Sequence, residues 1–600
     1  MKITGNEPLR FAVLTDTHIS PARTAVVEQL GRTYAALAGM APDFVLHCGD
    51  ITDTGLPHEY DLYQQAVPAA LRGRIRHVPG NHEVRWDPTA KELYQAQFGA
   101  APYSFDAAGV HFIGFDPTQP LLEPGHCGRE GLHWLDRDLA GLDRGRPVIM
   151  YHHFPVGRGH DYIDDQDALL DLLARHRVRA LFAGHIHRET VTRLGRLTQV
   201  TLTAFADGPS CYWAETARSP AGHPELMVSR LDLAGDATQE RHLVARVPLS
   251  GSWPGRRPKR PRRAVRPSGW RVRLAGSVQG GISAAGSTVV AASTVGQVTA
   301  LRPEDGGVRW QASLGPVYRR AAFDSTGRTV FIPSGDRHLY ALDAGTGQAR
   351  WRFDAGAPVL SAPLVAAADR DEYVVFGAGP QLFAVAAGTG RLAWSVPGRG
   401  WSAGRGACDG QRVYTCAADG YACAHDLRSG QEAWSYRMVT GGDEHRVALY
   451  SGWDCVVALG AGTVVVATVS GSHALDAATG ALRWSFPDSA MYPPAVVLDD
   501  GSALLTSEQG TVSRVALADG EIIWQARLDA RIQNAGPVVA GDRAWVVSEA
   551  GWLIGVRLAD GWRSGSRQLT RARCFSAPAV VDGTLIAGDQ DGFVHGIRLA

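Results

Sequence analysis

The first part of the chain alternates short apolar runs with segments in which apolar residues recur at helical spacing. The run FAVL (11–14) is followed by a segment with apolar residues three or four positions apart, and then by the run FVLH (44–47). A short apolar run indicates a buried strand, whereas apolar residues three or four apart indicate one buried face of a helix. This strand–helix–strand order predicts an α/β domain.

Beyond residue 268 the pattern changes to one that repeats. Units such as LYALDAGTGQARW (339–351) and HALDAATGALRW (473–484) contain a strand, a turn rich in Gly, Asp and Thr, and a second strand that ends in tryptophan. A period near 40 residues with short strands and turns is typical of a β-propeller. The repeated tryptophans are Trp310, Trp351, Trp394, Trp434, Trp484 and Trp524, spaced 41, 43, 40, 50 and 40 residues apart.

The repeat closes if the first strand completes the last unit. The unit LIGVRLADGWRSG (553–565) keeps the turn but has Gly565 in the tryptophan position, and the final unit GFVHGIRLA (592–600) lacks its last strand. Trp270 lies 40 residues before Trp310 and supplies that strand from the other end. We therefore expect eight blades, closed by an N-terminal strand.

The chain is too long for one hydrophobic core, since it has 600 residues and a mass of 64.2 kDa. Between the two patterns, GRRPKRPRRAVRP (255–267) mixes basic residues with proline and predicts an extended, solvated linker. A nucleic-acid arm is the alternative, but Lys+Arg and Asp+Glu both number 60, and no basic domain lies beside it. We predict an α/β domain over 1–250, a linker over 251–267, a propeller over 268–600, and no nucleic-acid partner.

The sequence shows neither an export signal nor a membrane segment. The first 20 residues lack the apolar core of a signal peptide, and no stretch approaches the roughly 18 apolar residues of a membrane span. The eight cysteines form no CxxC motif and no adjacent pair, which is typical of reduced thiols. We expect a cytoplasmic protein without a membrane partner.

Metal-ligating residue types collect directly after the apolar runs of the first domain, in AVLTDTHIS, LHCGDITD, HVPGNHE, MYHHFP and LFAGHIH. In an α/β sheet, the loops beyond the carboxyl ends of the strands converge on one crevice. Each segment alone has a structural explanation, such as a helix cap or a turn, but five together predict a metal site. The candidate residues are Asp16, His18, Asp50, Asn81, His82, His152, His153, His185 and His187.

The order of these segments resembles the pattern DxH, GD, GNH[D/E], H, GHxH of the calcineurin-like metallophosphoesterases, over roughly residues 8–235. The resemblance implies a four-layer αββα sandwich that holds two divalent metal ions and hydrolyses a small-molecule phosphate ester. The ligand set that it implies is Asp16, His18 and His187 for one ion, Asn81, His152 and His185 for the other, and Asp50 between both.

The implied chemistry uses both ions. Imidazole, carboxylate and amide donors suit Mn, Fe, Zn or Ni, so the ligands leave the metal open. Two ions roughly 3.5–4 Å apart can share a hydroxide, lower its pKa and stabilise an in-line displacement at phosphorus. The resemblance makes His82 the candidate general acid and Asp50 the bridging catalytic ligand. Arg85 is a candidate contact for the substrate phosphate, with a surface salt bridge as the alternative.

Two adjacent histidines follow the run VIMY (148–151), and only one of them is expected to bind a metal ion. Family members read H-[HS]-P, and the first histidine is the ligand. His152 is therefore the expected ligand, and His153 is expected to support the site or to lie in the turn. Phe154 stands where the family usually has proline.

Other motifs refine the resemblance. CGDITDTGLPHEY (48–60) and GPSCY (208–212) resemble the cyclic-nucleotide and glycerophosphodiester phosphodiesterase branch. Asp53 stands where purple acid phosphatases carry their coloured tyrosine, which argues against an iron–tyrosinate centre, and it is interpreted as a loop cap. The repeat ALDxxTGxxxW resembles that of the pyrroloquinoline-quinone (PQQ) dehydrogenases. We interpret its tryptophans as blade-packing residues and expect no PQQ.

Two functions fit the whole chain. The first is a phosphodiesterase or phosphatase whose propeller shapes substrate access or binds a protein partner. The second is a propeller-based scaffold with a vestigial phosphatase domain, and the intact ligand set argues against it. The longest repeat carries extra residues near 438–455, and we hypothesise that this loop leans over the metal crevice and limits which substrates enter.

Overall fold

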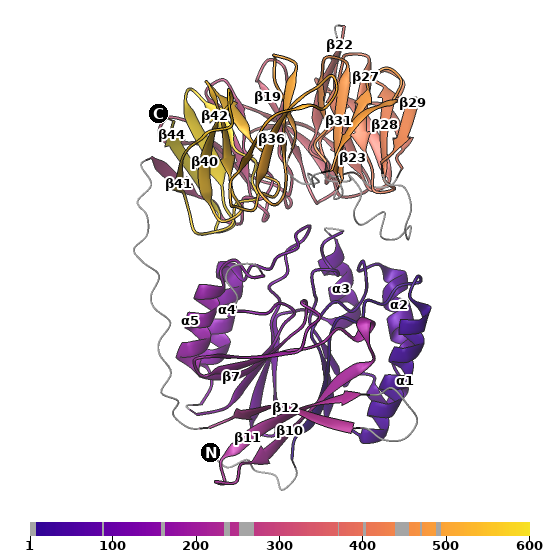
Figure 1. Cartoon of the computed structure of the whole chain (residues 1–600), viewed down its shortest axis with the longest axis vertical. Helices are drawn as coiled ribbons and strands as arrows, with labels where there is room; N and C mark the ends of the chain where they lie inside the picture. Colours follow the sequence, from indigo (N-terminus) through magenta and orange to yellow (C-terminus); the bar gives the residue numbers. More distant parts are fainter. Residues whose placement is uncertain are drawn as a thin grey trace. The chain divides into compact units, whose positions relative to one another are not determined.

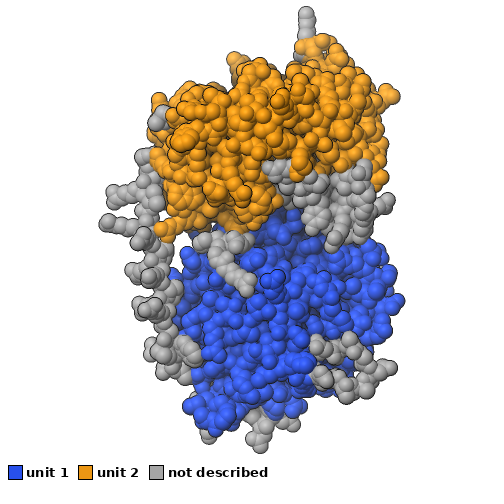
Figure 2. Space-filling view, in the orientation of Figure 1, with its two compact units in different colours: residues 1–262 blue, residues 263–600 orange. Residues whose placement is uncertain are grey.

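The computed structural model forms two compact units, Met1–Arg262 and Arg263–Ala600 (Figure 2). It describes all residues except 1–7, 87–88, 144, 158–161, 233–239, 251–268, 370, 400–401, 403, 439–454, 469–470, 488–493 and 600. The expected linker (251–267) and most of the expected substrate-limiting loop (438–455) lie outside the described residues.

Two six-stranded mixed sheets form the first unit. The first sheet has the order β12-β11-β10-β1-β2-β3 and the second the order β4-β5-β6-β7-β9-β8. The strands of the first are β1 (Arg10–Leu14), β2 (Phe44–His47), β3 (Ile75–His77), β10 (Ser210–Arg218), β11 (Pro224–Asp232) and β12 (Glu240–Pro248). Those of the second are β4 (Tyr103–Ala107), β5 (Val110–Gly114), β6 (Val148–Tyr151), β7 (Val178–Ala183), β8 (Thr190–Leu194) and β9 (Leu197–Thr201).

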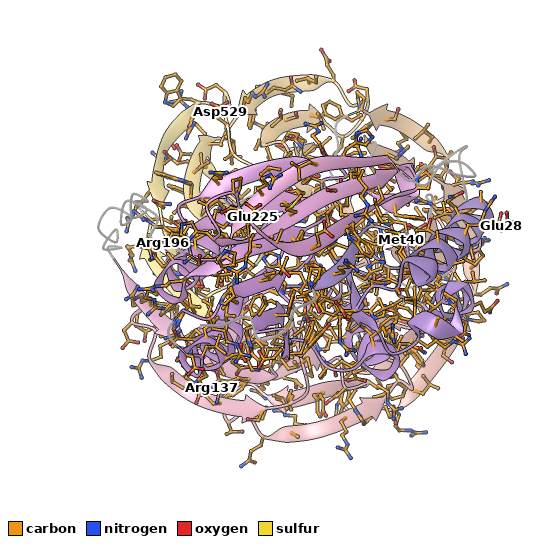
Figure 3. The ribbon with its side chains drawn as sticks, turned by 90° about the horizontal axis from the view of Figure 1, so that it is seen from below. Glu28, Met40, Arg137, Arg196, Glu225 and Asp529 are labelled. Carbon is orange, nitrogen blue, oxygen red and sulfur yellow. The ribbon has the colours of Figure 1, made fainter. Side chains whose placement is uncertain are left out.

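Helices cover the outer faces of both sheets, which confirms the four-layer expectation. One buried cluster packs the first sheet against α1 and its neighbours, and another packs the second sheet against α4 and α5. A third lies between the sheets. Figure 1 shows the two helical layers on opposite sides, and Figure 3 places Glu28 and Met40 of α1 far from Arg137 of α4. The helices are α1 (Thr24–Met40), α2 (Pro57–Ala66), α3 (Ala90–Phe98), α4 (Gly128–Ala140) and α5 (Gln166–His176).

The central strands are apolar on both faces because both faces are buried. In β6, Ile149 and Tyr151 point to the cluster between the sheets, whereas Val148 and Met150 point to the cluster under α4 and α5. This two-residue alternation is what a strand imposes on successive side chains. It continues past the end of β6 and decides where the next two residues point.

The second unit is an eight-bladed β-propeller, as the repeats predict. Each blade is a four-stranded antiparallel sheet, and seven blades use consecutive strands. The eighth joins β42 (Ala579–Val581), β43 (Thr584–Gly588) and β44 (Phe593–Arg598) to β13 (Trp270–Arg273), so the N-terminal strand closes the ring.

The seven consecutive blades follow one another in chain order. Their first and last strands are β14 (Ser283–Ala285) and β17 (Val308–Ser313), β18 (Ala322–Phe323) and β21 (Ala349–Asp354), β22 (Leu364–Ala368) and β25 (Leu392–Pro397), β26 (Ala407–Cys408) and β29 (Glu432–Arg437), β30 (Ala458–Gly460) and β33 (Leu482–Phe486), β34 (Val496–Val497) and β37 (Ile522–Arg527), and β38 (Val538–Ala540) and β41 (Arg563–Gln568).

The repeated tryptophans fasten each blade to the next, which confirms them as blade-packing residues. The indole of Trp351, on the outermost strand of one blade, donates a 3.0 Å hydrogen bond to the carbonyl of Ala387 in the following blade. Trp270, Trp310, Trp394, Trp434, Trp484 and Trp524 make the same inter-blade bond.

The ring of each tryptophan lies on a glycine of the neighbouring turn. A Cβ on Gly390 would come within 2.6 Å of Trp351 Cε3, and Gly390 has a φ of +68°. Only glycine satisfies both demands. This explains why turn glycine and strand tryptophan repeat together along the sequence.

No helix in the described part of the chain is long and apolar enough to span a bilayer. All eight cysteines are free thiols, and seven of them are buried.

Gly390→Ala should destabilise the propeller, because the added methyl overlaps Trp351 and the left-handed backbone disfavours alanine. We expect a loss of about 1–3 kcal/mol, as for other overpacked sites, measured as a lower midpoint of the propeller transition in calorimetry. Gly388→Ala in the same turn is the control, since a Cβ there meets nothing within 4 Å. Equal midpoints for the two variants would contradict the packing role.

Candidate metal centre

Six parallel strands of the first unit direct polar side chains to one edge of the two sheets. Strands β1, β2 and β3 pair in parallel, as do β6, β7 and β9. Each is followed within a few residues by site side chains, because the carboxyl ends of parallel strands lie at the same edge. The side chains are Asp16 and His18 after β1, Asp50 after β2, Asn81 and His82 after β3, His153 after β6, His185 and His187 after β7, and Asp207 after β9.

Five of these residues have left-handed backbones, which cost non-glycine residues of order 1–3 kcal/mol each. They are Asp16 (φ 53°), His18 (43°), Asp50 (50°), His185 (70°) and His187 (52°). The loops hold one another in this form, since Asp16 N–H donates to Gly49 O and His18 N–H to Asp50 O, both at 3.0 Å. Strain concentrated at one edge of the sheets is itself a mark of a functional site.

The first cluster contains Asp16, His18 and His187. His187 Nε2 lies 3.4 Å from Asp16 Oδ1 and 3.3 Å from His18 Nε2. The second nitrogen of each imidazole, Nδ1, contacts a carboxylate outside the cluster. His187 Nδ1 lies 2.8 Å from Asp207, and His18 Nδ1 lies 3.1 Å from Asp53. Such outer carboxylates orient imidazoles that ligate a metal through the opposite nitrogen.

The second cluster contains Asp50, Asn81, His153 and His185. His153 Nε2 lies 3.2 Å from Asp50 Oδ2 and 3.2 Å from His185 Nδ1. Asn81 Oδ1 lies 3.0 Å from the same His185 nitrogen. The Nδ1–H of His153 donates to the carbonyl of Cys48 at 3.0 Å, which leaves Nε2 for the cluster.

Asp50 lies between the clusters. Its Oδ2 is 3.2 Å from His153 Nε2 in the second cluster and 3.7 Å from His18 Nε2 in the first. Its Oδ1 accepts a 3.0 Å hydrogen bond from the backbone N–H of His82. Each carboxylate oxygen therefore has a defined environment, and one of them faces both clusters.

The charges of the site compensate one another. Burial alone would raise the pKa of Asp50, but the surrounding imidazoles, His153 first, hold it well below its usual range. Burial opposes a charge on His153, yet Asp50 raises the pKa of that histidine to about 9. A hydrogen bond to Asp16 likewise raises the pKa of His187 to about 9. A divalent cation would replace these imidazole protons, so metal binding and protonation compete for the same nitrogens.

The donor set fits the expected metals. Two carboxylates, one amide oxygen and four imidazoles converge from five loops, and this mixture suits Mn, Fe, Zn or Ni. The groups that could hold an ion include Asp16 with His18 and His187, and Asp50 with His153 and His185.

The structure corrects the expectation for the histidine pair, because His153 and not His152 joins the cluster. His152 N–H bonds to Phe182 O, so the strand geometry of β6 continues through this residue. Strand alternation then turns His152 to the helical side, against Phe115, and returns His153 to the side of Tyr151 and Asp50. His152 is fully buried, and burial lowers its pKa to about 3.

Arg85, the candidate contact for the substrate phosphate, forms a salt bridge in the structure. Its guanidinium pairs with Glu123 and lies 4.6 Å from the ring centroid of Trp86. The salt bridge that the sequence left as the alternative is therefore present, and contact with a substrate phosphate stays a prediction.

His82 lies at the edge of the first cluster. Its ring meets that of His18 edge to face at 4.6 Å, and its Nδ1 is 2.8 Å from the carbonyl of Asp53. A carbonyl accepts, so Nδ1 carries the proton and Nε2 is the atom available to a ligand. Burial lowers the pKa of His82, and the negative charge of Asp50 partly opposes this.

Three carboxylates support the site without having been predicted to do so. Asp53, interpreted as a loop cap, holds His18, and Asp207 holds His187. Glu83 accepts from the backbone N–H of Thr52 at 2.9 Å and of Gly80 at 2.8 Å, and so ties two loops together. Asp207 follows the apolar run TLTAF, so the rule that found the other residues applies to it as well.

Family comparisons divide the chain in the same way as the structure. A model described as calcineurin-like phosphoesterase matches residues 9–189. A model described as outer membrane protein assembly factor BamB matches residues 266–366, 339–487 and 469–600, which together exceed half of the chain.

Individual relatives match one part each. A probable glycerophosphodiester phosphodiesterase GpdQ of Arcobacter nitrofigilis is 28% identical over 171 residues, covering 27% of this chain and 62% of that protein, less than two thirds of its length. The 3',5'-cyclic adenosine monophosphate phosphodiesterase CpdA of Pseudomonas aeruginosa is 27% identical over 197 residues, covering 31% and 68%. The crystal structure of BamB from Moraxella catarrhalis shares 20% identity, covers 54% of this chain and 97% of that chain, and gives a TM-score of 0.46.

Gly184→Ala should disrupt the first cluster, because a Cβ at this position would lie 2.0 Å from Thr15 Oγ1 and 2.3 Å from Asp16 Oδ2. Asp16 would have to move, and we expect bound metal to fall by about one ion per chain in elemental analysis. Gly39→Ala, in α1 with open space around the added carbon, is the control and should keep its metal. Retention of full metal by both variants would refute this placement of Asp16.

Proposed function

We propose that this chain, which belongs to the calcineurin-like phosphoesterases through its first domain and to the BamB-like repeat family through its second, hydrolyses phosphoric esters at a centre of two divalent metal ions. One observation carries the proposal. Seven donor side chains from five loops form two clusters, and Asp50 faces both.

The site residues would bind the two ions in separate groups. Asp16, His18 and His187 would hold one ion, Asn81, His153 and His185 would hold the other, and Asp50 would bridge them. Two such ions supply Lewis acidity and lower the pKa of water between them. Asp53 and Asp207 fix the imidazoles of the first cluster, so that their Nε2 atoms face inward.

His82 would assist departure of the leaving group. A poor leaving group needs a proton, and the available Nε2 of His82 can supply one only when the imidazole is charged. Because burial lowers the pKa of His82, the charged form declines early as pH rises. The assistance should therefore be strongest at the acidic side of the activity profile.

Phosphodiesters are the substrate class to test first, since the named relatives include phosphodiesterases for glycerophosphodiesters and cyclic nucleotides. The propeller's role in substrate access or in binding a partner stays a prediction. The experiment is hydrolysis of bis(p-nitrophenyl) phosphate and p-nitrophenyl phosphate by the full chain, with Mn²⁺, Zn²⁺, Fe²⁺ or Ni²⁺ and after chelation. Hydrolysis that chelation abolishes and metal restores would support the proposal. Failure with every metal and both esters would contradict it.

His153→Leu should remove the second ion and lower turnover by at least about 100-fold, because an imidazole ligand is replaced by an alkyl chain. His152→Leu is the matched control. His152 lies against Phe115 and outside the cluster, so leucine at this position removes no donor atom from the metal site. Metal content and turnover of the two variants are compared side by side, and the reverse ranking would restore His152 as the ligand.

His82→Ala should keep both ions and lower turnover by about 10²–10⁴-fold on esters with alkyl leaving groups, the usual range for proton transfer. The loss should shrink on p-nitrophenyl esters, whose leaving group needs no proton. In wild type, the rate on alkyl esters should fall as pH rises through the pKa of His82. The role as acid fails if both ester types lose the same factor.

A further inference from the structure

A cavity of roughly 600 Å³ lies at the centre of the propeller, and all eight blades contribute to its wall. The contributing segments precede or include the innermost strand of each blade. One representative residue per blade is Gln279, Arg320, Leu364, Arg405, Val457, Val496, Asn534 and Phe575. Binding sites for small molecules typically have volumes of about 300–1,000 Å³, so the cavity is large enough for an organic ligand.

The charged side chains among the described residues that line this cavity are all positive. Three arginines line it, Arg319 and Arg320 from one blade and Arg405 from the second blade after it, and the described lining residues include no Asp or Glu. Among the groups that shift the pKa values of Arg320 and Arg405 in the described part of the chain, there is no carboxylate. Positive charges held in one cavity repel each other unless an anion compensates them.

The surroundings of Arg320 show this cost. Burial and, to a smaller extent, the positive charge of Arg405 together lower its pKa to about 10. The surrounding protein also lowers the pKa of Arg405 by displacing water from around it, although the residue remains exposed on one side. Arg320 also lines a second hollow of about 240 Å³ beside the first. The two guanidiniums thus repel each other, and an anionic ligand between them would reduce this repulsion.

A buried amide lies on the same wall. Gln279 is only 5% exposed, and its Nε2 has no hydrogen-bond partner among the described residues. A buried donor without a partner is unfavourable, because it has lost its hydrogen bonds to water and gained none in the protein. Gly280 brings this segment against Arg319, because a Cβ there would meet the Arg319 backbone at 2.5 Å.

The rest of the wall is mainly apolar, with Leu364, Val457, Leu459, Val496 and Phe575. An inorganic anion alone would fill little of the volume and would leave this surface wet. The arrangement instead fits a ligand with a compact anionic group for the arginines and an apolar or aromatic body for the remaining wall.

We propose that the central cavity of the propeller binds an organic phosphate, whose dianionic group lies between Arg320 and Arg405 and accepts a hydrogen bond from Gln279. A dianion matches two guanidiniums from two blades better than a monoanion does. Guanidinium is also the side-chain group best suited to phosphate oxygens. The site is separate from the metal centre, and it requires no chemistry.

The test uses phenylphosphonate, which has a dianionic head on an aromatic body and no ester bond to hydrolyse. Isothermal titration of the full chain should show one site that survives metal removal, with Kd raised at least about tenfold by Arg320→Gln or by Arg405→Gln, because each variant removes one of the two charges that contact the dianion. Arg437→Gln, on the outermost strand β29, is the matched control and should bind like wild type. Benzoate and benzyl alcohol test the head group, and both should bind at least about tenfold more weakly.

The proposed metal centre would also attract phosphonates, but that binding should disappear on metal removal and should be unaffected by Arg320→Gln. The proposed site survives in Asp50→Asn, so it can fail or succeed independently of the phosphoesterase activity. Without ligand, Arg320→Gln and Arg405→Gln should unfold at the same or a higher temperature than wild type, because each removes a repelled cation. Equal affinity in all arginine variants, equal binding of benzoate, or a lowered midpoint that shows a structural role would overturn the proposal.

Discussion

The first domain depends on one constraint, the burial of the carboxylates of Asp16 and Asp50 at the edge where two sheets end. Both are fully enclosed, and an enclosed negative charge is tolerated only beside positive charge. Imidazoles from three other loops supply that charge, and two of them have pKa values raised to about 9. The left-handed backbone of five site residues is the conformational cost of bringing these groups together.

Much of the metal site could be predicted from the sequence, because its residues follow apolar runs in a fixed order along the chain. Apolar runs followed by Asp, Asn or His locate the carboxyl ends of parallel strands, and the structure brings those ends together. The choice between His152 and His153 needed the direction of side chains in β6. Ile149 and Tyr151 face the first sheet, so the alternation of side chains along the strand places His153 on the side of Asp50. Asp53, Asp207 and Glu83 act through hydrogen bonds to other residues, and their roles depend on contacts between loops far apart in sequence.

The propeller was predictable for a different reason. Its blades repeat one local solution, in which a tryptophan on the outer strand lies over a glycine turn of the next blade and donates to its backbone. The pattern breaks at Gly565, where the last complete repeat meets the closing blade, and β13 then completes the ring. The central cavity could not be predicted in this way, because Gln279, Arg320 and Arg405 lie in segments outside the repeated motif.

The proposed hydrolysis requires two metal ions with Asp50 between them. Anomalous scattering from a crystal of the full chain soaked with Mn²⁺ would measure their positions. We expect two peaks roughly 3.5–4 Å apart, one beside Asp16, His18 and His187 and the other beside Asn81, His153 and His185, with Asp50 between them. A single peak, no peak at Asp50, or a second peak at His152 would contradict it.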